Sequence, residues 1–143
     1  MTTDDRTYAG ELASADAWRL LETEPNAVLL DVRTRAEWTY VGVPRLEALG
    51  RQAVFVEWQR YPDGSINPDF VEAVKAEGVD PEAPVLVICR SGQRSRAAAI
   101  ALTAHGFKRC INVADGFEGP RGEDGHRGGV AGWKAADLPW AQG

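Results

Sequence analysis

The sequence contains few of the residues that form metal sites and disulfides. Its 143 residues include two cysteines, two histidines and one methionine, and the Cys and His residues lack the spacing of metal ligands. We therefore expect no metal, and no motif indicates a nucleotide, flavin or other cofactor. The first ten residues, MTTDDRTYAG, have no apolar stretch, so neither a signal peptide nor a transit peptide is predicted. Without an export signal, two cysteines favour reduced thiols in a cytoplasmic protein over a disulfide.

Long apolar runs are also missing, because no stretch approaches the about 18 residues that a membrane span needs. Hydrophobic residues make up 44% of the chain and charged residues 26%, which is typical of a globular protein. A net charge of -5 disfavours broad attraction to nucleic acid or to an anionic membrane. We expect one domain over residues 1–143 that binds neither.

Acidic residues are absent from one part of the chain, between Ala83 and Ala114. The basic residues there are Arg90, Arg94, Arg96, Lys108 and Arg109. This window therefore carries a charge of +5 and the rest of the chain -10, and both Cys89 and Cys110 lie inside it. An anion site containing a thiol is expected in this window.

Short apolar runs alternate with helical periodicity along the chain, which predicts an α/β domain with a largely parallel sheet. The expected strands are 28–32, 54–58, 85–88 and 111–114. One expected helix begins at the cap Ser14 and another at the cap Asn67. A third presents an apolar face of Ala97, Ile100, Ala101 and Ala104 and ends at Gly106, and a short helix at about 133–140 closes the chain. Strand 85–88, the helix after it and strand 111–114 form a strand-helix-strand unit, and ligands of such units collect at the carboxyl ends of the strands.

A polar segment follows Cys89, at the carboxyl end of the second buried strand. Its residues are Arg90, Ser91, Gly92, Gln93, Arg94 and Ser95. If Cys89 were only a small buried hydrophobe, there would be no reason for polar residues, two arginines and a glycine to follow it directly. An anion-binding loop explains these residues. The free N–H groups and the dipole at the start of the next helix attract an anion, and Gly92 lets the backbone curl without a Cβ clash. The same field favours a thiolate, so we predict that Cys89 is a nucleophile.

Other candidate residues have simpler structural explanations. Cys110 enters an apolar strand and is predicted to be a small buried hydrophobe. Asp31 and Arg33 at the end of a strand are expected to form an internal ion pair, with Glu37 as a further partner, although a place in the pocket stays open for them. His105 ends a helix, where it interacts favourably with the helix dipole.

Four groups of residues form a recognisable pattern. They are Asp31-Val32-Arg33 with Glu37-Trp38 and Gly42; Cys89 to Ser95; Gly106-Phe107 with Asn112-Val113; and Gly128-Gly129 with Trp133. The pattern resembles the single-domain rhodanese-like (thiosulfate sulfurtransferase) family over about residues 10 to 140. The resemblance implies a central, mostly parallel five-stranded sheet flanked by helices on both faces.

The position of Gly128-Gly129 departs from the family pattern. In the family this pair directly follows Asn-Val-Ala, which here would place it at 115 and 116, so the chain has a 13-residue insertion. The insertion lies in a polar, Gly-rich segment at about 116–132, which holds seven of the fifteen glycines. A functional lid, a mobile insertion and a partner-binding loop all stay open for it.

The resemblance also implies a reaction. The Cys89 thiolate attacks the outer sulfur of a donor such as thiosulfate, sulfite leaves, and N–H groups of the loop hold the resulting persulfide. Arg90 and Arg94 attract the anionic donor, and cyanide or a thiol removes the sulfur. The expected partners are therefore a small anionic sulfur donor and a thiol or cyanide acceptor, while the oligomeric state is not indicated.

Two alternatives remain at this point. A rhodanese-like module can carry sulfur as a persulfide without turnover, or bind a partner, and one sequence does not separate these roles from catalysis. A cysteine phosphatase or arsenate reductase is less favoured, because a phosphatase loop needs Arg at position 95, where this chain has Ser95.

Overall fold

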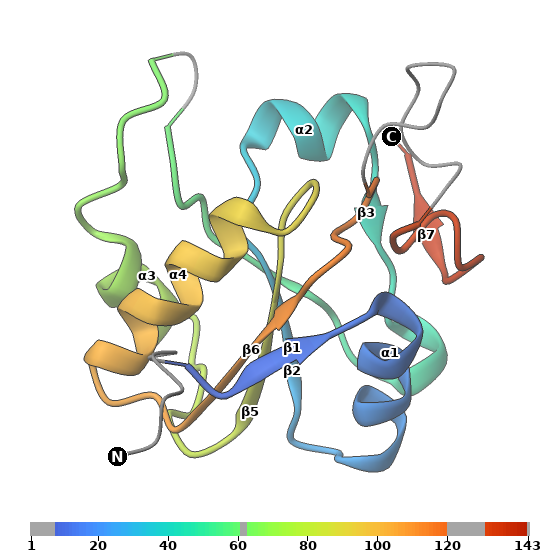
Figure 1. Cartoon of the computed structure of the whole chain (residues 1–143), viewed down its shortest axis with the longest axis horizontal. Helices are drawn as coiled ribbons and strands as arrows, with labels where there is room; N and C mark the ends of the chain where they lie inside the picture. Colours follow the sequence, from blue (N-terminus) through green and yellow to red (C-terminus); the bar gives the residue numbers. More distant parts are fainter. Residues whose placement is uncertain (1–7, 61–62, 120–130, 143) are drawn as a thin grey trace.

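The computed structural model describes residues 8–60, 63–119 and 131–142. The strands are β1 (Gly10–Leu12), β2 (Val28–Asp31), β3 (Val43–Pro44), β4 (Val54–Phe55), β5 (Pro84–Ile88), β6 (Arg109–Val113) and β7 (Trp140–Ala141). The helices are α1 (Ser14–Thr23), α2 (Arg35–Tyr40), α3 (Phe70–Ala76) and α4 (Gln93–Ala104), with a 3-10 turn at Glu47–Leu49. Figure 1 shows α3 and α4 on one side of the central sheet, α1 on the other, and α2 near the carboxyl ends of the strands.

The central sheet has five strands in the order β1-β6-β5-β2-β4, and every neighbouring pair is parallel. The predicted fold class is therefore confirmed. The parallel order follows from the helical crossovers between strands, and burial on both faces explains the continuous apolar run of β5. β3 and β7 form a separate antiparallel pair.

The core has two halves, one on each face of the sheet, and β5 contributes to both. Val85, Val87 and Cys89 pack with residues of α3 and α4, whereas Leu86 and Ile88 pack with residues of α1. This alternation is the period of two of a β-strand. It places the Cys89 side chain on the face that α4 covers.

Ser14 begins α1, but it does not cap the helix as expected. The residue before the helix is Ala13, and it makes no side-chain cap. Ser14 is instead buried, and its backbone N–H and hydroxyl both donate to Asp115 Oδ1, at 3.0 and 2.8 Å. The serine therefore ties the start of α1 to the end of β6.

The segment between β4 and α3 is also less regular than predicted. The expected strand 54–58 is reduced to β4, two residues long. α3 begins at Phe70 rather than beside the expected cap Asn67. The Asn67 carboxamide oxygen accepts the N–H of Asp69 at 3.0 Å, so Asn67 closes a turn ahead of the helix and does not cap its first turn.

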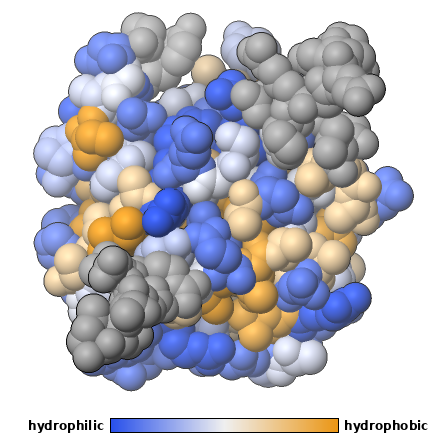
Figure 2. All heavy atoms as spheres, viewed as in Figure 1, coloured by the Kyte–Doolittle hydropathy of each residue, from blue (hydrophilic) through white to orange (hydrophobic). Residues whose placement is uncertain are grey.

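Helix α4 has the expected position, but the expected apolar face was wrong. Its buried residues are Ser95, Ala98, Ala99 and Leu102. Ile100, which the periodicity placed in the core, is 37% exposed. Figure 2 shows isolated hydrophobic residues among hydrophilic ones on the face of the molecule where α4 lies. In an alanine-rich helix either face is small enough to pack, so hydrophobicity alone does not choose the buried one.

The helix expected at about 133–140 is not formed. Residues 131–137 form turns, and the chain then pairs with β3 through β7. The N–H groups of Trp133 and Lys134 donate to the carbonyls of Gly116 and Phe117, at 2.8 and 3.1 Å, which fixes the backbone in a non-helical path. Of the Gly-rich insertion, the structure describes only 116–119 and 131–132. His126 and Gly128-Gly129 lie outside the described residues.

Candidate sulfur-transfer site

The Cys89 loop lies at the carboxyl end of β5, between β2 and β6, and leads directly into α4. The sequence predicted this position, which is the edge where parallel α/β sheets bind ligands. The loop is shorter than expected, because α4 begins at Gln93, two residues before Ser95. Gln93, Arg94 and Ser95 therefore belong to the first turn of the helix.

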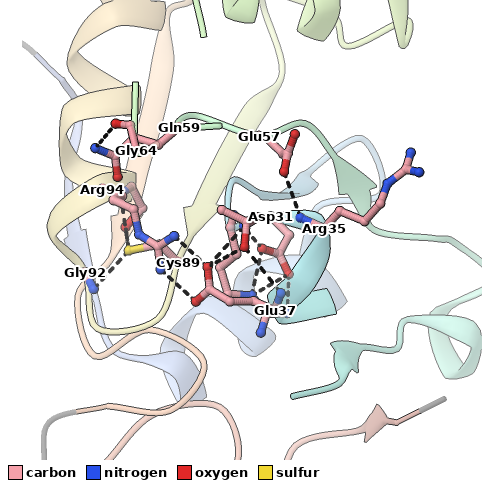
Figure 3. Close-up of polar contacts among 12 residues, drawn as sticks. Asp31, Arg35, Glu37, Glu57, Gln59, Gly64, Cys89, Gly92 and Arg94 are labelled. Atoms are coloured by element: carbon pink, nitrogen blue, oxygen red, sulfur yellow. Dashed lines mark hydrogen bonds and ion pairs between the residues drawn. The ribbon is translucent and has the colours of Figure 1, made fainter. Parts of the chain in front are cut away.

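The Cys89 sulfur is surrounded by hydrogen-bond donors. It accepts the backbone N–H groups of Gly92 at 3.2 Å and Ser95 at 3.3 Å, and the Ser95 hydroxyl lies 3.2 Å away. Figure 3 shows Cys89 under Arg94, with a dashed line to Gly92. Because the Ser95 hydroxyl donates its proton to Asn112, the donors to the sulfur are the two backbone N–H groups, which lie at the start of the 12-residue α4, where the helix dipole favours an anion.

Asn112 supports this arrangement from β6. Its carboxamide oxygen accepts the Ser95 hydroxyl at 2.5 Å, and its amide group donates to the Gly92 carbonyl at 3.0 Å and to Glu11 at 2.9 Å. Asn112 is buried. Sequence reasoning assigned Asn112 no role at the site, although a polar residue inside an apolar strand was a usable signal.

Gly92 is required by the shape of the loop. It has φ +105°, and a Cβ at this position would lie 2.3 Å from the carbonyl oxygen of Ala114. The positive φ and the close approach of β6 both favour glycine, as the sequence predicted. The loop is therefore pressed against the end of the neighbouring strand.

The segment after β6 holds the other side of the loop. The Phe117 N–H donates to the Cys89 carbonyl at 2.8 Å, and the N–H groups of Glu118 and Gly119 donate to the Arg90 carbonyl at 3.0 and 3.1 Å. These bonds fix the backbone of Cys89 and Arg90 to the start of the insertion.

Arg94 and Glu37 form an ion pair at the entrance to the site. Arg94 Nη1 and Nη2 donate to the two carboxylate oxygens of Glu37 at 2.6 and 2.8 Å, with both side chains about one-fifth exposed. Figure 3 shows this pair beside Cys89. Glu37 also completes a capping box with Thr34, which starts α2. Arg94, which the sequence assigned to the donor, is thus already occupied by a carboxylate.

Asp31 and Arg33 form a buried ion pair, as expected. Arg33 Nη2 lies 2.7 Å from Asp31 Oδ2, both side chains are fully buried, and Arg33 also donates to the Gly42 carbonyl at 2.8 Å. The Arg33 guanidinium stacks on the Phe117 ring, 4.3 Å from its centre. Glu37, suggested as a further partner, instead accepts hydrogen bonds from Arg94 and from Thr34 at the α2 cap, and the charge of Arg33 acts on it only as a lesser contribution that lowers the pKa of its carboxyl. The burial of both side chains favours the structural role.

Two adjoining cavities share Gln59, Arg90 and Arg94, and the smaller one reaches Cys89. The first, of about 220 Å³, is lined by Gln59, Cys89, Arg90, Ser91, Gln93 and Arg94. The second, of about 440 Å³, is lined by Gln59, Arg90, Arg94, Glu37, Val41 and Glu118. The sequence did not point to Gln59, whose side chain is held over the site by donating to the Gly64 carbonyl at 3.0 Å (Figure 3).

Cys110 differs from Cys89. It is fully buried in the core half that α4 covers, and burial raises the pKa of its thiol to about 11. Both cysteines are free of disulfides. Cys110 is therefore the inert cysteine that the sequence predicted.

Two further sequence predictions concern metals and membranes. Within residues 8–60, 63–119 and 131–142, no group of three or more His, Cys, Asp and Glu side chains is placed to hold a metal ion. Across that same part of the chain, no helix combines the length and apolar character that crossing a bilayer requires.

The parallel sheet and the cysteine loop at the end of β5 are those of a rhodanese-like domain. The chain belongs to the rhodanese-like family, and over residues 9–143 it matches the family model described as the STR4 middle domain. The family expected from the sequence is confirmed.

Curated relatives cover most of the chain. An uncharacterized protein of Rickettsia conorii, RC0915, is 38% identical over 130 residues, which is 90% of this chain and 94% of that protein. The thiosulfate sulfurtransferase GlpE of Actinobacillus succinogenes is 30% identical over 129 residues, which is 90% of this chain and 87% of that protein.

Solved structures share the fold. Rv0390 from M. tuberculosis has a TM-score of 0.86 and 47% identity, covering 95% of this chain and 99% of its own. The polysulfide-sulfur transferase of Wolinella succinogenes has a TM-score of 0.61 and 25% identity, covering 96% of this chain and 80% of its own. At the level of the family, these similarities support a sulfurtransferase.

Proposed function

We propose that the protein moves sulfane sulfur from thiosulfate or a related donor to cyanide or a thiol, through a persulfide on Cys89. The observation that carries this proposal is the environment of the Cys89 sulfur. Two backbone N–H groups and the start of α4 face the sulfur, and a small cavity opens over it. This environment suits a thiolate and then a bound persulfide.

The proposed cycle has two displacements. The Cys89 thiolate attacks the outer sulfur of thiosulfate, a new S–S bond forms, and the S–S bond of thiosulfate breaks with its electron pair leaving on sulfite. Cyanide then attacks the outer sulfur of the Cys89 persulfide, which releases thiocyanate and restores the thiolate. The reaction requires reduced thiols, so we place it in the cytoplasm.

Known relatives agree with this chemistry. Two similar proteins are named as a thiosulfate sulfurtransferase and a polysulfide-sulfur transferase, which supports sulfur transfer as the proposed reaction. A phosphatase reading is disfavoured, because the position that needs Arg holds Ser95, which is buried against Asn112 and gives no cation to a phosphate.

A steady-state assay tests the proposal. Thiocyanate formation is measured with cyanide as acceptor and thiosulfate or cysteine persulfide as donor, for wild type, Cys89→Ser and Cys110→Ser. We expect Cys89→Ser to lose more than about 1,000-fold in kcat/KM with both donors, because the nucleophile is gone. The matched Cys110→Ser variant should keep activity. Normal turnover by Cys89→Ser would contradict the proposal, and sulfur loading without turnover by wild type would identify a carrier instead.

A further inference from the structure

The charges at the entrance to Cys89 nearly cancel. Arg90 and Arg94 line the larger cavity together with Glu37 and Glu118, so its lining has two cations and two carboxylates. The charged groups behind it, Asp31 and Arg33, neutralise each other. The +5 window of the sequence therefore does not produce a strongly cationic pocket.

Arg94 is committed to Glu37 by two short hydrogen bonds. Burial alone would raise the pKa of the Glu37 carboxyl, but its hydrogen bonds and charge interaction with Arg94 hold that pKa below its ordinary value. The hydrogen bonds that Arg94 donates to the Glu37 carboxylate likewise raise the pKa of Arg94. Both groups are therefore charged at neutral pH, and a donor anion must compete with Glu37 for the Arg94 guanidinium.

Arg90 is the remaining cation of the entrance. It is exposed, and among the described residues its side chain has no acidic partner. Glu118 faces the same cavity, and its carboxylate offsets part of the Arg90 charge. The ammonium of Lys134 donates to the Val41 carbonyl at 3.1 Å and lies 4.0 Å from the centre of the Trp140 ring, contacts that leave it charged. Burial lowers the pKa of Lys134 and the charge of Glu118 opposes this, so Glu118 balances the charge of Lys134. Among the residues that the structure describes, the entrance thus offers about one free positive charge to a ligand, that of Arg90.

The two donor classes differ in the charge that they bring to this entrance. Thiosulfate is a dianion, so its encounter with the Cys89 thiolate gathers three negative charges. The sulfur of an organic persulfide brings at most one negative charge, because R–S–SH ionises to R–S–S⁻, so the same encounter gathers no more than two. Because repulsion between like charges grows in a partly buried site, one free arginine suits the second encounter and not the first.

On the basis of the proposed function, we infer that Glu37 selects the sulfur donor, and that the preferred class is a low-charge organic persulfide rather than thiosulfate. The Cys89 thiolate attacks the outer sulfur of R–S–SH, and the Cys89 Sγ–S bond forms. The donor S–S bond breaks, its electron pair leaves on R–S⁻, and the proton stays on the transferred sulfur. The larger cavity, of about 440 Å³, accommodates the organic group R.

The test compares kcat/KM for cysteine persulfide and for thiosulfate with cyanide as the common acceptor. In wild type the persulfide should be the better donor. In Glu37→Gln, which frees Arg94 while keeping an oxygen for the α2 cap, the ratio of thiosulfate to persulfide kcat/KM should rise by about tenfold. Glu118→Lys adds positive charge without touching α2, and it should raise the same ratio even if Glu37→Gln folds poorly.

The matched control is Glu47→Gln. Glu47 is an exposed carboxylate that pairs with Arg45 at 2.6 Å and lines neither cavity at Cys89. Its removal makes the same change in net charge and should leave the donor ratio unaltered. The inference is overturned if thiosulfate is the better donor for wild type, or if the ratio stays constant in Glu37→Gln and Glu118→Lys. Failure of both donors to deliver sulfur to Cys89 would instead refute the proposed function.

Discussion

Gly92 determines the geometry of the sulfur site because only a residue without a side chain fits its position in the loop. Its N–H donates to the Cys89 sulfur, its carbonyl accepts from Asn112, and its Cα lies against Ala114. These contacts require the chain to turn with a positive φ where another strand passes. The loop that holds the sulfur therefore depends on glycine at this position.

Replacing Gly92 with Ala should lower the free energy of unfolding by about 3 kcal/mol or more, from backbone strain and from the clash with the Ala114 carbonyl. Gly78→Ala is the matched control. Gly78 also has a positive φ, +84°, but an added Cβ there would meet nothing within 4 Å, so about 1 kcal/mol is expected. Urea unfolding measures both values. Equal losses of unfolding free energy in the two variants would show that the clash with the Ala114 carbonyl contributes little.

At this scale, the sequence predicted the residues whose roles depend on their neighbours along the chain. Cys89 and Gly92 were found because a polar, glycine-containing segment follows an apolar strand. The partners of Arg94 and Ser95 were not found, because Glu37 and Asn112 are 57 and 17 residues away from them. Such pairs form only when the elements are assembled.

Among the elements, α2 and α4 are joined by the Glu37–Arg94 pair. The pKa of Glu37 is lowered in the folded protein, so the carboxylate stabilises the fold at pH values above its ordinary pKa of 4.5. This contribution is lost as the pH falls through the lower pKa of the folded state. The pair therefore stabilises the position of α2 at neutral pH and ceases to do so in acid.

Glu37→Gln should consequently be less stable than wild type at about pH 7, and this difference should shrink below about pH 4. Urea unfolding of both proteins at the two pH values measures the difference. Glu47→Gln serves as control, because its pair with Arg45 is exposed and screened by solvent, and it should show a smaller dependence on pH. A stability difference between wild type and Glu37→Gln that does not change with pH would contradict this account.

The elements also differ in how far the sequence determined them. Strand β5 was predicted because a continuous apolar run between turns admits few other structures, and β6 because a short, mostly apolar run follows the stop signal of α4. The buried face of α4 was missed because five of its twelve residues are alanines, which lie on both the buried and the exposed side of the helix. The C-terminal segment was assigned to a helix because its pattern is helical, yet Trp133 is held by the carbonyl of Gly116 from a distant segment.

For the whole molecule, the acidic total of -5 contains a basic window in which two of the five cations are paired with carboxylates. Arg94 binds Glu37, and Arg109 lies 3.2 Å from Glu24. Glu37 and Glu24 both lie outside the window. The sequence therefore shows where the cations are, but not how many of them lack a carboxylate partner in the folded protein. In the part of the chain that the structure describes, the window places Arg90 and Arg94 at the site and leaves about one available positive charge, that of Arg90, beside the Cys89 sulfur.

The central claim is that Cys89 accepts a sulfur atom, and the mass of the intact protein tests it most directly. Reduced wild type, Cys89→Ser and Cys110→Ser are incubated separately with thiosulfate and with cysteine persulfide, freed of donor, and measured without reductant. We expect wild type and Cys110→Ser to gain the mass of one sulfur atom and to lose it again on addition of cyanide, while Cys89→Ser gains none. An unchanged mass of wild type with both donors, or an equal gain by Cys89→Ser, would contradict the account.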